Sequence, residues 1–216
     1  MTGPDSTAIR ISAVRHGILL SYATIGYNSL EAIGSLAAGI LAGSVALVGF
    51  GIDSVIEVTA SVAAQWRLRT DANLSQRYET EVLTLRIVGW CFIALATYVA
   101  VDSLRSLYLV EEPDRSWFGV IVLVLSVIVM PVLAFAKRRV AIRIESTALE
   151  AEAKQTSFCA YLSVIALAGV GLNALFGWWW ADPAAALIMT PIILREGILT
   201  IRASRTRTTT AVDLCC

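Results

Sequence analysis

The sequence contains few charged residues and a single histidine, and these two scarcities exclude several kinds of protein. Only 16% of its 216 residues are Asp, Glu, Lys or Arg, whereas soluble domains carry about 25%. Because 57% of the residues are hydrophobic, we expect an integral membrane protein without a sizeable soluble domain. With His16 as the only histidine, the sequence offers neither a Ser-His-Asp triad nor an HExxH zinc site.

Several motifs that would indicate an enzyme, a pump or a secreted protein are also missing. No GxxxxGK[ST] motif is present, so the sequence does not encode an ATP-driven pump. The cysteines form no CxxC pair. Cys91 and Cys159 lie in separate apolar segments, and Cys215 and Cys216 are the last two residues. This placement does not resemble a disulfide framework. Residues 1–16 lack the apolar core of a signal peptide. We therefore expect no catalytic residues and no prosthetic group.

Long apolar segments are what the sequence does contain. A helix of roughly 20 apolar residues crosses a bilayer, and six segments reach about that length: residues 17–43, 44–66, 82–110, 117–136, 148–176 and 178–201. We predict an all-α protein with six transmembrane helices in a domain covering residues 17–201. A short N-terminal arm at 1–16 and a short tail at 202–216 would flank this domain.

Basic residues gather in alternate connections, and this pattern predicts the orientation of the chain. Most of them lie in four segments: the N-terminal arm, residues 66–81, the connection that begins with Lys137, and the C-terminal tail. The connections on the opposite side carry Arg115 alone. The positive-inside rule therefore places both termini in the cytoplasm. Trp117 and the run 178–180 would mark the outer interface, where indole rings prefer to lie. This topology accounts for the arginines and argues against nucleic-acid binding. The short chain without a targeting segment predicts a multi-pass protein of the cell inner (plasma) membrane.

Two carboxylates lie in the middle of the second apolar segment. Asp53 and Glu57 are the only charged residues between Ser44 and Trp66, and a spacing of four places them on one face of a helix. Burying one carboxylate in a bilayer costs about 3 kcal/mol, and two on one face also repel each other. A divalent cation would neutralise both, so the pair predicts a metal-transport site.

The fifth apolar segment supplies a second face of candidate ligands. Gln155 and Cys159 are also four residues apart and share a helix face. If this face packed against Asp53 and Glu57, two carboxylates, an amide oxygen and a thiolate would surround one ion. Such a set suits tetrahedral Zn²⁺ or a similar divalent ion. The alternative is structural, with Cys159 as a small buried hydrophobe and Gln155 as an interhelical hydrogen-bonding residue.

These segments resemble the cation diffusion facilitator (cation efflux) family. The second span of that family resembles SLALLADALHSLVD, and residues 43–57 follow this pattern with Glu57 where Asp is usual. The fifth-span pattern resembles ADAxHxxxDVxxS, and this sequence matches its frame with Gln155 at the usual His and Cys159 at the usual Asp. Residues 180–187 are similar to the start of the sixth span of the family.

The resemblance implies export of a cytoplasmic divalent metal in exchange for protons by a homodimer. Family members commonly carry a cytoplasmic metal-binding domain after the sixth span, so we expect a short member that lacks this domain and pairs through its spans. Because Gln155 does not titrate, proton coupling would use Asp53, Glu57 or Cys159. Zinc is favoured, while the mixed thiolate and carboxylate set leaves iron, cadmium, manganese and cobalt open.

Three further residues are auxiliary candidates. Asn28 and Glu31 share a face of the first segment, where they would line the cavity beside the ion or form interhelical hydrogen bonds. Glu152 lies at the cytoplasmic entrance of the fifth segment. There it would attract cations or simply pair with Lys154 or Arg143.

Asp182 is a further acid for which the sequence suggests a role. It stands directly before Pro183 at the start of the sixth apolar segment. An aspartate ahead of a proline is typical of a helix start. We therefore predict that Asp182 caps the sixth helix.

Two classes of function fit the sequence. One is a secondary active transporter that exports a divalent metal, with Asp53, Glu57 and Cys159 as principal ligands and Gln155 as a weaker one. The other is a non-transporting membrane protein that binds metal, or none, and acts in assembly or sensing. The substituted His and Asp positions favour the second class. The stacked acids favour transport, because structural helices have little reason to keep two carboxylates in lipid.

Overall fold

The described residues form six helices, whose lengths follow from the long apolar segments. The computed structural model describes residues 4–69, 74–144 and 147–213, and these parts of the chain contain no strand. The helices are α1 (Pro4–Ala42), α2 (Val45–Arg69), α3 (Leu74–Leu109), α4 (Trp117–Ile144), α5 (Thr147–Phe176) and α6 (Ala181–Asp213).

Within the described residues, five helices are long and apolar enough to cross a membrane, and the protein is therefore a multi-pass helical membrane protein, as predicted. The crossing segments within the described ranges are Val45–Val62, Val82–Leu109, Trp117–Ile142, Glu152–Phe176 and Ala181–Arg205. Helix α1 falls outside this set because Asn28 and Glu31 lower the hydropathy of its middle. Both side chains are buried, and α1 packs along α2 and α4.

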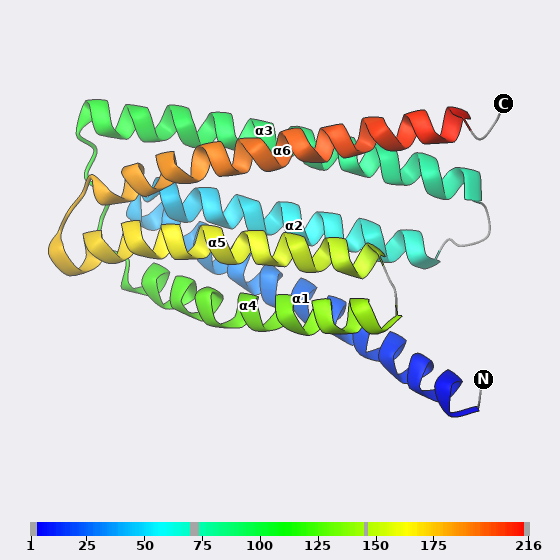
Figure 1. Cartoon of the computed structure of the whole chain (residues 1–216). Helices are drawn as coiled ribbons and strands as arrows, with labels where there is room; N and C mark the ends of the chain where they lie inside the picture. The colour runs from blue at the N-terminus through cyan, green and yellow to red at the C-terminus, as the bar shows by residue number, and fades with distance from the viewer. Residues whose placement is uncertain (1–3, 70–73, 145–146, 214–216) are drawn as a thin grey trace.

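The helices form a bundle in which the first helix starts and the last helix ends on the same side (Figure 1). The start of α1 and the end of α6 lie at this end, together with the end of α2, the start of α3, the end of α4 and the start of α5. Helix α3 packs along α6, and α4 packs along both α5 and α1. Six alternating helices thus return the chain to its starting side, which is the topology that the sequence predicts.

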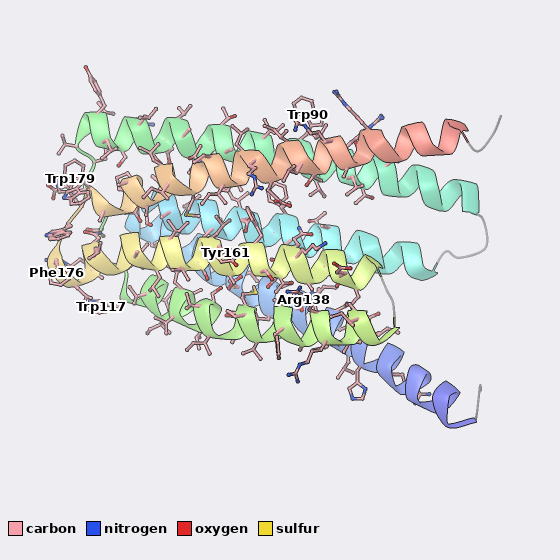
Figure 2. All side chains as sticks on the ribbon, in the orientation of Figure 1. Trp90, Trp117, Arg138, Tyr161, Phe176 and Trp179 are labelled. Atoms are coloured by element: carbon pink, nitrogen blue, oxygen red, sulfur yellow. The ribbon has the colours of Figure 1, made fainter. Side chains whose placement is uncertain are left out.

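Aromatic residues gather at the opposite end of the bundle. Figure 2 places Trp117 and Trp179 there, and places Arg138 toward the end that holds the termini. The rings of Trp178 and Trp180 stack with 5.6 Å between their centroids. The tryptophans that the sequence predicts at the outer interface thus lie together at one end of the bundle.

Helix α2 lies in the core of the bundle, in contact with α1, α3, α5 and α6. Leu47 and Phe50 on this helix are fully buried. Asp53 and Glu57, on the next turns, are only 2% and 3% exposed. The two acids therefore face protein rather than lipid, as intramembrane ionisable groups generally do.

Asp182 anchors the first turn of α2, which corrects the prediction that it caps its own helix. Its carboxylate accepts hydrogen bonds from the Ser44 hydroxyl at 2.5 Å and from the backbone amides of Val45 at 3.0 Å and Ala46 at 3.5 Å. The first amides of a helix have no partner within the helix, and an acid there satisfies them. The start of α6 lies beside the start of α2, so the carboxylate reaches the neighbouring helix.

Two glycines allow α3 and α6 to touch backbone to backbone. A Cβ atom on Gly89 would lie 2.6 Å from Cγ1 of Ile201 and 3.0 Å from the carbonyl oxygen of Gly197. A Cβ atom on Gly197 would lie 2.9 Å from the carbonyl oxygen of Gly89. Small residues at such crossings are the usual means of close helix packing in membranes.

We expect Gly89→Ala to destabilise the bundle because the added methyl group must push α6 away from α3. Overpacking of this kind costs roughly 1–3 kcal/mol, which lowers the thermal midpoint of a chain of this size by about 2–12 °C. A thermal scan of detergent-purified protein would measure the change. Gly171→Ala is the control, since its Cβ atom would meet nothing within 4 Å. Equal midpoints for the two variants would contradict the close crossing.

Candidate metal centre

The two acids of α2 lie one helical turn apart beside α1. Gly51, two residues before Asp53, brings α1 close, because a Cβ atom there would lie 2.8 Å from Cγ of Leu36. Ser54, one turn after Gly51 on the same face of α2, then donates a hydrogen bond from its hydroxyl to Glu31 of α1. One glycine thus helps to gather side chains from two helices.

Helix α5 contributes a thiol and a hydroxyl to the same group. Cys159 is 1% exposed, and its thiol faces both Asp53 and Glu57. Thr156 donates a hydrogen bond from its hydroxyl to Oε1 of Glu57 at 3.1 Å. The predicted contact between the second and fifth segments therefore exists, and it joins three of the four predicted ligands.

Gln155, the fourth predicted ligand, is placed differently. It is only partly buried, and in the part of the chain that the structure describes no hydrogen bond joins it to the two acids. Successive residues of a helix are turned by about 100°, and the side chain that reaches Glu57 is that of Thr156. Sequence reasoning missed Thr156 because the family pattern directed attention to the position before it.

Helix α1 adds a third carboxylate and an amide. Oε2 of Glu31 accepts a hydrogen bond from the Ser54 hydroxyl at 3.0 Å and from the Cys159 thiol at 3.9 Å. Asn28, three residues before Glu31, is fully buried and faces Glu57. Both auxiliary candidates from the first segment thus lie in the same cluster as the principal acids.

Several polar atoms of this cluster are buried without a hydrogen-bond partner. They are Oε2 of Glu57, Oε1 of Glu31, and both Oδ1 and Nδ2 of Asn28. Buried polar atoms are nearly always satisfied in proteins, and unpaired carboxylate oxygens in a membrane are especially unfavourable. Among the residues with described side chains, no three of His, Cys, Asp or Glu already form an ion-holding group. A bound cation would therefore draw the carboxylates together.

Comparison with known families identifies the context of this cluster. The family model described as the cation efflux transmembrane domain matches residues 21–206. The match spans every residue of the cluster, from Asn28 to Cys159. The chain belongs to the cation efflux family. No curated protein sequence matched it. As a cation efflux protein, the chain is a membrane transporter of metal cations.

One end of the cluster in this cation efflux protein holds a buried ion pair that the sequence did not predict. Oε2 of Glu152 lies 3.4 Å from Nζ of Lys137 and accepts a hydrogen bond from the Ser21 hydroxyl at 2.8 Å. Lys154 pairs instead with Glu150, at 3.0 Å. Pairing of Glu152 with Lys154 is therefore wrong, and the side chain of Arg143 lies outside those that the structure describes.

The location of Lys137 corrects the prediction that it belongs to a cytoplasmic connection. Helix α4 continues past it to Ile144, and the side chain of Lys137 is 0% exposed. The neighbouring Arg138 and Arg139 are exposed. The sequence pattern does not predict this difference, because Ile142, four residues after the exposed Arg138, is as apolar as Ala141, four residues after Lys137.

Proposed function

We propose that this cation efflux protein exports a divalent metal from the cytoplasm and binds it between α2 and α5, with Asp53, Glu57 and Cys159 as principal ligands. One observation carries the proposal: two acids and a thiol from these helices are buried together inside a membrane domain. A divalent cation would offset two negative charges that the bilayer strongly disfavours. Gln155 stays a weaker fourth ligand in this proposal, and it would have to turn inward to serve.

The chemistry of the ligands favours zinc. A thiolate prefers zinc or cadmium, whereas carboxylates also suit iron, manganese and cobalt. Zinc accepts both ligand types in a four-coordinate shell. Glu31 and Asn28 are the auxiliary groups that would complete such a shell from α1.

We further propose that metal moves in exchange for protons. Carboxylate and thiolate ligands bind either a proton or a metal ion, so metal loading releases protons. Asp53, Glu57 and Cys159 are the principal ligands available for this exchange, with the auxiliary carboxylate of Glu31 beside them, since the amide of Gln155 and the hydroxyl of Thr156 do not titrate in the working range.

The assembly and the location of the protein are also part of the proposal. The family resemblance implies a homodimer, which would pair through the helices of the bundle. The basic end of the bundle would face the cytoplasm and the tryptophan-rich end the outside. The proposed location is the cell inner (plasma) membrane, with the entrance beside Glu152 facing the cytoplasm.

The proposed function predicts zinc flux in reconstituted vesicles. We expect purified protein in proteoliposomes to move Zn²⁺ faster than protein-free vesicles, reported by a trapped zinc-sensitive dye. A pH-sensitive dye in parallel samples should report proton movement in the opposite direction. A panel of Zn²⁺, Cd²⁺, Fe²⁺, Mn²⁺ and Co²⁺ would rank the substrates. No flux for any of these ions from folded protein would favour a non-transporting role in metal binding, sensing or assembly.

A further inference from the structure

A lysine ammonium is buried next to the candidate metal centre. Nζ of Lys137 lies 3.4 Å from Oε2 of Glu152 and 3.3 Å from Oγ1 of Thr156. Burial of an ammonium is strongly unfavourable unless an anion and hydrogen-bond acceptors surround it. The Lys137 side chain is therefore held between two groups of α5, and one of them also contacts Glu57.

The hydrogen bonds from Lys137 to Glu57 run in one direction only. An ammonium donates and never accepts, whereas an ionised carboxylate only accepts. The Thr156 hydroxyl consequently accepts from Lys137 and directs its single hydrogen toward Oε1 of Glu57, 3.1 Å away, or toward the carbonyl oxygen of Glu152, 3.0 Å away. Lys137 thus prepares Thr156 to act as a donor to a candidate ligand.

The charge of Lys137 also acts on the acids directly. Lys137 lies within electrostatic reach of Glu57, and Glu57 in turn interacts with the negative charges of Asp53 and Glu31. A fixed positive charge so close to these acids offsets part of their repulsion. The same charge repels an incoming divalent cation, and the weak screening inside the bundle strengthens this effect.

We propose that Lys137 is the resident counter-cation of the metal centre. It pairs with Glu152 and holds Glu57 through Thr156 when no divalent ion is bound, and it gives up Thr156 and keeps only Glu152 when an ion takes its place. Its positive charge lowers the affinity of the acids for the divalent ion, and this lower affinity allows the ion to be released. Lys137 is a positioning residue rather than a ligand, and its role rests on the proposed function.

The first test compares Lys137→Met with wild-type protein in lipid nanodiscs. Loss of the positive charge should tighten Zn²⁺ binding about tenfold in calorimetry. In proteoliposomes both the half-saturating zinc concentration and the maximal flux should fall, because the ion leaves more slowly. Lys137→Arg keeps the charge and should bind zinc as the wild type does. Lys154→Met is the matched control, since that side chain is 76% exposed.

A charge-balanced pair of variants covers the case in which Lys137→Met fails to fold. Glu152→Gln leaves the ammonium of Lys137 without its anion. We therefore expect Lys137 to interact more strongly with Glu57 and the affinity for zinc to fall about tenfold. Adding Lys137→Gln to this variant should restore binding at least to the wild-type level. A double variant that binds zinc as weakly as Glu152→Gln would overturn the role of Lys137 and make Glu152 a direct ligand.

The outcomes separate this inference from the proposed function. If wild type and Lys137→Met bind zinc with equal affinity, the role of Lys137 as counter-cation is wrong, whereas the proposed metal transport is unaffected. If wild-type protein binds neither zinc nor another divalent ion of the panel, the proposed function fails and the inference fails with it.

Discussion

Asp53→Asn should nearly abolish metal export while leaving the bundle folded and at least as stable as before. Asparagine has the shape of aspartate, so the packing around α2 persists. It removes one of the two stacked negative charges, and a neutral amide is easier to bury than a carboxylate. Because loss of a mere supporting residue lowers metal affinity by 10–100-fold, loss of a direct ligand should lower zinc flux by about 100-fold or more.

Zinc uptake by proteoliposomes, zinc calorimetry and a thermal scan of the same preparation would measure these effects together. Activity and stability should change in opposite directions, which a general loss of folding could not produce. Asp102→Asn is the control, since this acid of α3 accepts a hydrogen bond from Tyr98 at an exposed position. An Asp53→Asn variant with full flux and affinity would show that the ion sits elsewhere.

Asp182→Ala should cause the largest loss of stability among single substitutions of the described acids outside the metal centre. Its carboxylate serves the Ser44 hydroxyl and two backbone amides at the start of α2. Buried donors without an acceptor cost about 1–3 kcal/mol each, and loss of a helix cap costs about 1 kcal/mol. Because the cap energy is already contained in the two amide bonds, the lower bounds for the three donors give a total of roughly 3 kcal/mol, or a fall of about 6–12 °C in the thermal midpoint.

A thermal scan against Asp114→Ala tests this expectation, because Asp114 is an exposed acid in the connection between α3 and α4, at the same end of the bundle. The thermal midpoint of Asp182→Asn should lie between those of Asp182→Ala and Asp114→Ala, since the amide oxygen of asparagine can still accept one hydrogen bond. Equal midpoints for Asp182→Ala and Asp114→Ala would contradict the cap on α2.

The residues that sequence reasoning placed well are those whose position depends on helix geometry within one segment. Asp53 and Glu57 share a face because 3.6 residues complete a turn, and they are buried because a membrane leaves ionised groups few other places. Cys159 followed from the same spacing and from the family pattern. These inferences needed no knowledge of neighbouring helices beyond the expectation that α2 and α5 meet.

Inference was wrong or incomplete where the position of a side chain depends on which helix lies beside it. Asp182 has the sequence signature of a cap for its own helix, yet its carboxylate reaches the adjacent start of α2. Lys137 follows a clean apolar segment and reads as an interfacial lysine. The burial of its side chain is evident only in the packed structure, where α5 lies against α4 and its residues Glu152 and Thr156 contact the ammonium.

The sequence by itself determined that this chain is a multi-pass helical membrane protein of the cation efflux family with two acids stacked on its second span. Composition, apolar length and helical spacing are local properties, and each can be evaluated from neighbouring residues alone. Only the tertiary structure decided that Thr156 rather than Gln155 contacts Glu57, and that Lys137 joins the cluster. These contacts depend on the rotation and depth at which separate helices pack, which arise from the fit of side chains across the whole bundle.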